Sequence, residues 1–389
     1  MKHREKSSAS KATRLLLCVM LLAAGARAVE AHTASFHVPS ARELDAYVSR
    51  EMRKRHIPGL SLAVVRDGRV IKLKGYGLAS VELGVPATPE TVYQLASTTK
   101  IFTGAAVTLL AQEGRLSLDD PVTKLLPELP AAWSVVTVRH CLTHTSGLPD
   151  ASLSDDTDEV IAPTGPEALV KLAALPFVSA PGEKWEYNQT GYMLLGMIIE
   201  RLSGETFERF LARRFFQPLG MSATIFGDST AVVRGRATLY TRYVMREGKL
   251  APAPDERVRT QQFTYPDYLH PGAGLNSTAS DMAKWDAALT AGRVLKRSTL
   301  AEMWTAAKMQ DGHAFRFEDS TLGYGLGWMV DDTPGHKSAG HSGGDATAYI
   351  RFITDRLSVI VLTNCQGAGP EDIVGGIATL YVPALADVK

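Results

Sequence analysis

The sequence predicts an α+β fold: one antiparallel sheet built from both chain ends and flanked by helices, with a helical region inserted between the two halves. Strand-like segments occur near both ends of the chain, at 60–74 and at 324–363, whereas the segments between them have helical spacing. Strands and helices do not alternate, which argues against a parallel βαβ sheet. With 45% hydrophobic and 21% charged residues, the chain has the composition of a globular protein with a sizeable core.

Residues 1–28 are expected to be a secretory signal peptide. A basic start precedes an apolar run at 15–24, and Ala26-Arg27-Ala28 is a typical cleavage site. The run is too short to span a bilayer; an uncleaved anchor is the alternative. Cleavage would remove six basic residues and one acidic residue, leaving a mildly acidic chain without an electrostatic footprint for nucleic acid. We therefore expect an exported protein, periplasmic or secreted, with no nucleic-acid partner and no stable membrane insertion after cleavage.

The first predicted element of the mature chain is a β-hairpin. Residues 60–65 and 70–74 have strand-like composition, and Arg66-Asp67-Gly68-Arg69 separates them. Asp-Gly between two such runs is typical of a tight hairpin turn.

Helical spacing begins at Ser97. Apolar residues within 101–110 recur as a buried helix face requires, and Gly114 is a candidate C-cap. Further helices are predicted at 137–144, 167–175, 190–202, 206–216 and 279–289, the last with Thr278 or Ser280 as its cap. Four prolines between 226 and 271 indicate irregular loops there.

The C-terminal part returns to strands, predicted at 324–330, 348–354 and 358–363, and ends in a helix at 372–381. The mature domain is therefore expected to be 29–389. Its sheet part covers about 40–120 and 275–389, and its helical part about 121–274.

Ser97-Thr98-Thr99-Lys100 is the first candidate for chemistry. Residues i and i+3 share a helix face, so the serine hydroxyl and the lysine ammonium can meet. A serine at a helix N-terminus lies where developing negative charge is favoured, and a partly buried lysine can act as its base. The spacing alone is weak evidence, because Ser8 and Lys11 repeat it in the predicted signal peptide. A capping serine with a solvated lysine is the alternative.

Gly340-His341-Ser342-Gly343-Gly344 matches the G-x-S-x-G pattern of α/β-hydrolases. That pattern requires a strand–turn–helix elbow and a later catalytic histidine. No histidine follows His341, and the segment after Gly344 is strand-like. Ser342 is therefore rejected as the nucleophile.

The sequence contains further candidate functional residues: a tyrosine motif, a histidine pair and two cysteines. Tyr187-Asn188-Gln189 precedes the helix predicted from 190, and its tyrosine is either a packing residue or a general base that serves Ser97. His140 and His144 lie four apart but lack an acidic third ligand, so we expect no metal. Cys141 and Cys365 are interpreted as buried free thiols, although one disulfide between them stays open.

Together these segments resemble the serine β-lactamase and penicillin-binding-protein superfamily, most of all its class C branch with D-peptidases and β-lactamase-like esterases. The motifs at Ser97, Tyr187 and His341 occur in that family's order and rough separation. The segments 144–148 and 272–281 also resemble the family's helix-ending turn and Gly-rich turn. The likeness covers about residues 60–364 and implies a β-lactamase/transpeptidase-like fold.

The resemblance implies a role for each motif residue. Ser97 attacks a carbonyl, Lys100 and Tyr187 move its proton, and His341 faces the serine from an edge strand. The backbone N–H groups of Ser97 and Gly344 form the oxyanion hole. The remaining implied substrate-binding residues are Gln189, Ser342 and Gly343. Water cleaves the acyl-enzyme without a cofactor, and His144 is structural.

Two positions depart from the β-lactamase pattern: His341 replaces the usual lysine of the third motif, and Gln189 replaces an asparagine. Histidine is fully charged only below its usual pKa of about 6.5, so the sequence predicts that activity changes near pH 6–7. We rank hydrolysis of a small ester or D-amino-acid peptide first, and β-lactam hydrolysis or D-Ala-D-Ala carboxypeptidase activity second. The rival is a non-catalytic peptide- or cell-wall-binding protein of the same fold, against which intact Ser97, Lys100 and Tyr187 argue.

Overall fold

The computed structural model describes residues 36–152, 160–246, 249–255, 257–318 and 320–387. The predicted signal peptide at 1–28 lies outside these ranges. Within them, no helix is both long enough and apolar enough to cross a membrane.

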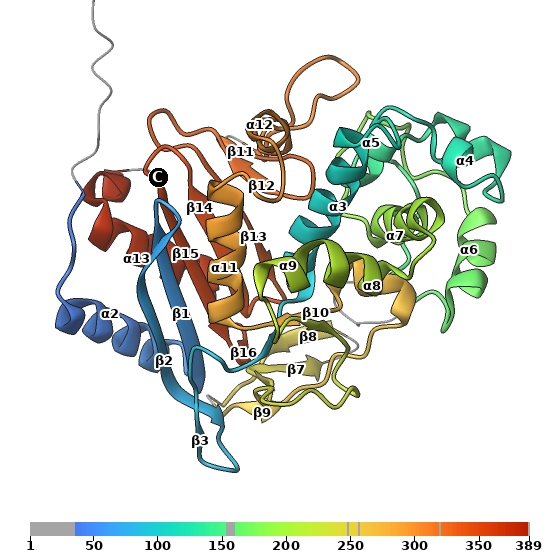
Figure 1. The fold of residues 1–389 in the computed structure, drawn as a ribbon. Helices are drawn as coiled ribbons and strands as arrows, with labels where there is room; N and C mark the ends of the chain where they lie inside the picture. Colours follow the sequence, from blue (N-terminus) through green and yellow to red (C-terminus); the bar gives the residue numbers. More distant parts are fainter. Residues whose placement is uncertain (1–35, 153–159, 247–248, 256, 319, 388–389) are drawn as a thin grey trace, which may run out of the picture. The chain divides into compact units, whose positions relative to one another are not determined.

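An eight-stranded sheet forms the centre of the fold, and all of its strand pairs are antiparallel. Figure 1 shows strands from the N-terminal part lying beside strands from the C-terminal part. The expected sheet from both chain ends is thereby confirmed. In spatial order the strands are β11 (Leu322–Tyr324), β12 (Met329–Asp331), β13 (Ser338–Gly343), β14 (Thr347–Phe352), β15 (Leu357–Thr363), β1 (Gly59–Arg66), β2 (Arg69–Ser80) and β3 (Val85–Pro86).

The predicted hairpin is formed by β1 and β2. Asp67 and Gly68 make its turn with φ values of 52° and 73°, and two consecutive positive φ angles match the right-handed twist of the flanking strands. Strand β1 is buried along almost its whole length, as is β15 beside it. Both faces of the sheet are therefore covered at its centre.

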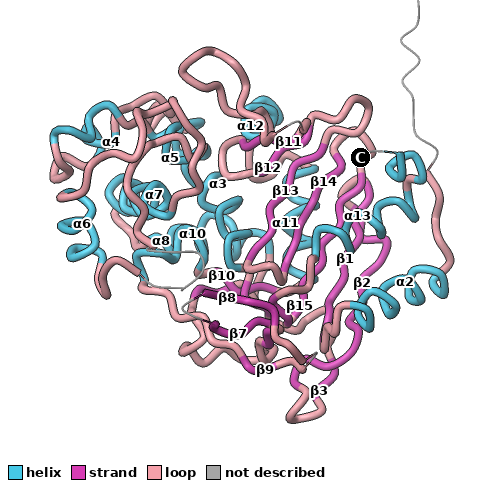
Figure 2. Tube along the Cα trace, turned by 180° about the vertical axis from the view of Figure 1, so that it is seen from behind, coloured by secondary structure: helices cyan, strands magenta, loops and turns pink. Residues whose placement is uncertain are grey.

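Helices provide that cover. On one face α11 (Ala279–Thr290) contacts β1, β2 and β15, and it lies in front of the strands in Figure 1. On the other face, seen from behind in Figure 2, α13 (Pro370–Tyr381) contacts β14 and β15 and packs with α2 (Ala41–Lys54). Thr278 caps α11 through the Asp281 N–H, as predicted.

The inserted region is mainly helical and packs around α3 (Lys100–Gln112), which precedes it, and its own α7 (Gln189–Ser203). Gly114 follows the end of α3 with a φ of 73°, which fits the predicted C-cap role. The helical elements between the two strand-rich ends are η1 (Ala96–Thr99), α3 (Lys100–Gln112), α4 (Val122–Leu125), η2 (Ala131–Val135), α5 (Val138–Leu142), α6 (Gly165–Ala173), α7 (Gln189–Ser203), α8 (Phe207–Leu211), the π-helical η3 (Ala212–Phe216), α9 (Gln217–Leu219), η4 (Asp267–Leu269) and α10 (His270–Ala273). Later in the chain come α12 (Arg297–Met303) and η5 (Pro383–Asp387).

Two details of the prediction were wrong. The segment 324–330 is not one strand: its ends belong to β11 and β12, and residues 325–328 form the turn between them. A Cβ at Gly325 would overlap the Met303 carbonyl oxygen, and Gly327 has a φ of 83°, so this stretch does not continue as a strand. The stretch 226–271 is not purely irregular. It contributes to three small sheets through β5 (Ile225–Phe226), β6 (Tyr240–Thr241), β7 (Tyr243–Arg246), β8 (Lys249–Pro252) and β9 (Arg259–Thr260), whose other partners are β4 (Tyr93–Gln94), β10 (Leu275–Ser277) and β16 (Cys365–Gln366).

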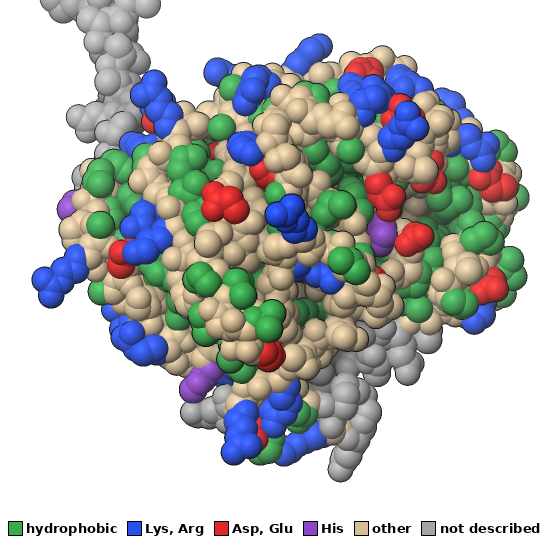
Figure 3. All heavy atoms as spheres, turned by 60° about the horizontal axis from the view of Figure 1, so that its bottom comes forward, with side chains coloured by type: hydrophobic (Ala, Val, Ile, Leu, Met, Phe, Trp, Pro, Cys, Tyr) green, Lys and Arg blue, Asp and Glu red, His purple; other side chains and the backbone are tan. Residues whose placement is uncertain are grey.

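The surface in Figure 3 carries basic and acidic side chains interspersed with apolar ones. Neither sign of charge dominates this face. A mixed surface of this kind has no strong single-sign field.

Candidate active site

Ser97 lies in η1, the tight turn that leads directly into α3. The residue before it, Ala96, has a φ of 44°, a left-handed conformation that side chains rarely adopt. Non-glycine residues are held in this region only where the surroundings impose it, and such positions cluster at functional sites. The Thr99 hydroxyl accepts the Leu275 N–H at 3.1 Å and fixes the turn from the far side. Ser97 itself is half-buried.

Lys100 is the first residue of α3 and is completely buried. Its Nζ donates to Gln189 Oε1 at 3.1 Å and to the Gly272 carbonyl oxygen at 2.9 Å. The same atom lies 4.5 Å from the ring centroid of Tyr187 and 5.0 Å from that of Tyr192. Two oxygen acceptors and two aromatic faces replace water around the ammonium, so this lysine is not the solvated surface residue of the alternative interpretation.

Gly272, on α10, makes this arrangement possible. A Cβ at this position would overlap Gln189 Oε1, the atom that accepts from Lys100. Only glycine therefore lets α7, α10 and α3 approach closely enough for both acceptors to reach one ammonium.

Tyr187 and Gln189 lie where α7 begins, as the sequence predicted. Asn188 is the N-cap, and its side chain accepts the Gly191 N–H. The Tyr187 hydroxyl is buried, and its ring faces Lys100 Nζ. Because Gln189 Oε1 accepts from Lys100, its amide NH₂ is the part that can donate to a substrate carbonyl.

Strand β13 forms the opposite wall of the site. It lies between β12 and β14, so the expected edge position was wrong; the strand nevertheless packs against η1. A Cβ at Gly343 would overlap the Leu95 carbonyl oxygen and lie 3.0 Å from the Ser97 nitrogen. Gly344 follows with a φ of 56°, and a Cβ there would be 3.4 Å from Ala96 Cβ. The structure thus brings Gly343 and Gly344 against the nucleophile turn, with the half-buried Ser342 next to them.

His341 is buried and both of its ring nitrogens are engaged. Nδ1 lies 2.6 Å from the Ser342 carbonyl oxygen, and Nε2 lies 3.0 Å from the Tyr324 hydroxyl. A carbonyl can only accept, so Nδ1 carries the proton and Tyr324 donates to Nε2. Burial and the nearby Lys100 charge lower the pKa of His341 from 6.5 to about 3. The histidine is therefore neutral at ordinary pH, and the expected change of its charge near pH 6–7 is not supported.

Local sequence patterns did not reveal two members of the site, Tyr192 and Tyr324, and gave no role toward Lys100 to Gly272. Tyr192 was counted only as part of a helix, and Tyr324 as part of a strand. No pattern of neighbouring residues indicates that they meet Lys100 and His341. The turn that holds the lysine was recognised only through the resemblance of 272–281 to the family's Gly-rich turn.

His140 has a structural role in the turn that starts α5. Its Nδ1 accepts the Thr137 N–H at 3.2 Å, while Thr137 caps the helix. Among the described residues, no group of three or more His, Cys, Asp or Glu side chains is arranged to hold a metal ion. Cys141 and Cys365 are both buried and free, which confirms the interpretation as separate thiols.

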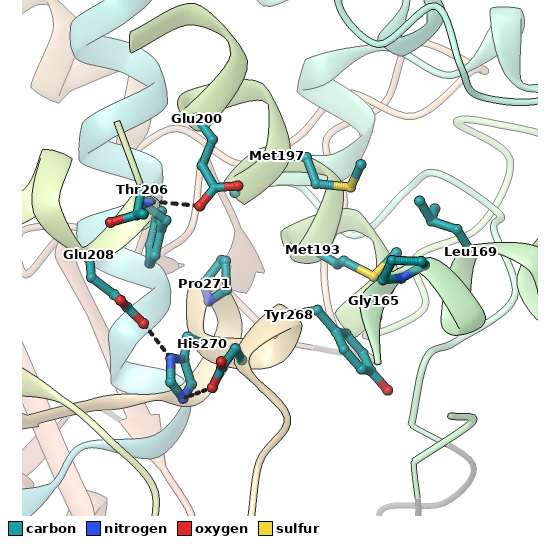
Figure 4. Close-up of a pocket in the computed structure, with 14 residues that line it drawn as sticks. Gly165, Leu169, Met193, Met197, Glu200, Thr206, Glu208, Tyr268, His270 and Pro271 are labelled. Carbon is teal, nitrogen blue, oxygen red and sulfur yellow. Dashed lines mark hydrogen bonds and ion pairs between the residues drawn. The ribbon is translucent and has the colours of Figure 1, made fainter. Parts of the chain in front are cut away.

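A cavity of about 380 Å³ lies elsewhere in the helical region (Figure 4). Met193 and Met197 face it from α7, and Glu208 reaches across to His270 Nδ1 at 2.7 Å. None of the predicted catalytic residues lines it. Its wall at Pro271 adjoins Gly272, so the cavity is a neighbour of the lysine site and is separated from it by α10.

Comparisons with known proteins show the family and the fold to which this site belongs. A family model described as Beta-lactamase matches residues 44–382. "Protein flp" of Staphylococcus aureus (strain NCTC 8325 / PS 47) is 35% identical over 200 residues, which cover 48% of this chain and 38% of that protein. The chain thus spans well under half the length of the first curated relatives it matches.

Solved structures match over more of the chain. The octameric penicillin-binding protein homologue from Pyrococcus abyssi has a TM-score of 0.71 and 30% identity, covering 90% of this chain and 78% of that one. D-amino acid amidase from Ochrobactrum anthropi SV3 has a TM-score of 0.71 and 26% identity, covering 89% and 99%. The fold class and the superfamily resemblance inferred from the motifs are confirmed.

Proposed function

The chain belongs to the β-lactamase family and is a serine hydrolase of the β-lactamase and penicillin-binding-protein fold; from this premise we propose that it cleaves an ester or amide bond through an acyl-enzyme on Ser97. The observation that supports this most strongly is the completely buried Lys100, held between Gln189 Oε1, the Gly272 carbonyl and the Tyr187 ring. An ammonium is costly to bury, and a site built to hold one beside a serine has a chemical purpose.

In the first half of the reaction, Ser97 Oγ forms a bond to the substrate carbonyl carbon and gives its proton to the Tyr187–Lys100 pair. The backbone N–H groups of Ser97 and Gly344 stabilise the oxyanion, and losing one such donor costs about 10²–10³ in rate. The bond to the leaving group then breaks, and the alcohol or amine departs with the transferred proton.

In the second half, water adds to the acyl carbon and loses a proton to the same pair. The ester bond to Ser97 breaks, the acid leaves, and the proton returns to Oγ. The Gln189 amide and the backbone beside Ser342 and Gly343 align the substrate. The reaction uses only these protein groups.

The neutral His341 offers no cation to a substrate carboxylate and therefore favours a substrate that does not need one at this position. A lysine at this position would offer a cation to a substrate carboxylate, whereas both nitrogens of His341 already have partners within the protein. We therefore keep a small ester or a D-amino-acid amide or peptide as the first substrate class. The match to a D-amino acid amidase supports the amide branch. β-Lactam hydrolysis stays second.

We also propose that residues 1–28 direct export and are then removed. The test is Edman sequencing of the protein recovered from the medium or periplasm. A mature N-terminus directly after residue 28 is expected; retention of the full chain in the cytoplasm would refute it.

A fluorophosphonate probe and a substrate panel test the main proposal. We expect a covalent adduct on Ser97 that disappears in Ser97→Ala, and turnover of p-nitrophenyl esters or D-amino-acid amides faster than of nitrocefin. A protein that forms no adduct and turns over no activated ester would instead support the non-catalytic binding alternative.

A further inference from the structure

His144, to which the resemblance gave only a structural role, contacts the segment 186–188 around Tyr187 at three points. Its backbone oxygen accepts the Glu186 N–H at 2.9 Å, and its Nδ1 accepts the Asn188 N–H at 3.0 Å. Its ring lies 4.4 Å from the Tyr187 ring, with an angle of 36° between the planes. The residues directly before and after the tyrosine, and the tyrosine ring itself, are thus all fixed by one side chain and its backbone.

The backbone conformation and the burial of His144 are both energetically unfavourable. Its φ of 58° is unusual for a non-glycine residue, and only 1% of its surface is exposed. Because Nδ1 accepts a backbone N–H, the neutral ring carries its proton on Nε2. That atom is buried, and no residue in the described part of the chain accepts its proton. A strained backbone and a buried unpaired donor persist only where the surroundings impose them.

Other aromatic rings close the space around His144. Tyr192 lies 5.1 Å away, Tyr324 4.8 Å and Trp185 5.8 Å, measured between ring centroids. Burial, followed by the nearby Lys100 charge, lowers the pKa of His144 well below its usual value. The ring therefore contributes shape and hydrogen bonding to the site, not a titrating charge.

We propose that His144 is a positioning residue that sets the Tyr187 ring against Lys100, and thereby governs the rate of proton transfer from Ser97. This inference rests on the proposed function of Ser97. It goes beyond a general structural role, because it predicts that a change at His144 slows the chemical step while the protein stays folded and binds substrate as before. Displacement of a catalytic group by about 1 Å can cost about 10²-fold in rate.

His144→Asn is the informative variant. Asparagine tolerates a positive φ, and its side-chain oxygen can accept the Asn188 N–H in place of Nδ1, so only the ring is lost. His140→Asn is the matched control. It changes the same residue type four positions earlier, where Nδ1 also accepts a backbone N–H, from Thr137. His144→Phe makes the complementary change by keeping a ring and removing the acceptor.

For each variant, kcat and KM are measured on the ester that the wild type turns over best, together with the fraction of Ser97 labelled at completion and the melting temperature. We expect His144→Asn to lower kcat about 10- to 100-fold with KM within about threefold and Ser97 labelled to completion. His140→Asn should stay within about twofold of wild type in both constants. We expect His144→Phe to lower kcat less than His144→Asn, because it retains the ring contact.

Three results would overturn the positioning role. The first is an unchanged kcat in His144→Asn, and the second is an equal loss of kcat in His140→Asn. The third is a loss of kcat in His144→Asn that is fully explained by a smaller fraction of labelled Ser97. Failure of the proposed function looks different, because the wild type itself would then leave Ser97 unlabelled.

Discussion

The two walls of the site differ in chemistry. The helical wall, from α3, α7 and α10, contains Lys100 and Tyr187, and it surrounds the buried ammonium with oxygen acceptors and aromatic rings. The strand wall, from β13, contains a histidine that burial keeps neutral and two glycines that press against the nucleophile turn. The comparison indicates that proton transfer belongs to the helical wall, whereas the strand wall supplies shape and backbone N–H groups.

The largest effect is expected on the helical wall. Lys100→Met should lower kcat/KM by about 10⁴-fold, since it removes the cation and leaves the Gly272 carbonyl without its donor. Lys284→Met is the control, because Lys284 also donates to a carbonyl oxygen, that of Gly220, but lies on α11. Steady-state kinetics on an activated ester provides the measurement. Equal losses in the two variants would show that the effect is not specific to Lys100 and its wall.

Tyr187→Phe should lower kcat/KM by about 10²- to 10³-fold, because the ring over Lys100 stays while the proton-transferring hydroxyl is lost. Tyr268→Phe is the matched control. The Tyr268 hydroxyl donates to the Ala162 carbonyl oxygen at 2.7 Å, and this tyrosine lines the cavity of Figure 4, not the lysine site. Both are measured with the same ester. A Tyr187→Phe enzyme as fast as its control would assign the tyrosine to packing alone.

On the strand wall, Gly343→Ala should lower kcat by about 10²-fold, because the added Cβ overlaps the Leu95 carbonyl and pushes β13 away from the Ser97 nitrogen. Gly375→Ala in α13 is the control, since its added Cβ meets no atom within 4 Å beyond its chain neighbours and the backbone of its own helix. Kinetics and melting temperature are recorded for both. Full activity in Gly343→Ala would mean that this close approach has no catalytic role.

Sequence reasoning succeeded where neighbours in the chain decide the structure. The turn at Asp67-Gly68, the cap at Thr278 and the start of α7 all depend on residues within a few positions of one another. It failed where contacts span the chain. Gly272 lies 172 positions after Lys100, and nothing near either residue indicates that they meet.

Short elements were missed for a related reason. The strands within 226–271 are two to four residues long, too short for an alternating pattern to be recognised. The charge state of His341 depends on burial and on Lys100, which the sequence alone does not provide.

The smallest effect concerns pH. Unfolded His341 takes up a proton near its ordinary pKa of 6.5, whereas folded His341 does so only near 3. The unfolded state therefore binds more protons between these values, and the free energy of unfolding should fall as pH falls from 6.5 towards 3, by at most about 1.4 kcal/mol per pH unit from this group. Denaturant unfolding between pH 7.5 and 4 should show a shallower decline in His341→Gln. Identical declines would contradict the neutral histidine.

The central claim is that the helical wall transfers the proton of one serine, Ser97. Rapid quenching of the wild type with an activated ester, followed by peptide mass spectrometry, tests it most directly. The expected result is a transient acyl group on the peptide containing Ser97, formed much more slowly in Lys100→Met at a temperature where that variant is still folded. An acyl group on Ser342, or full turnover by Ser97→Ala, would contradict the account.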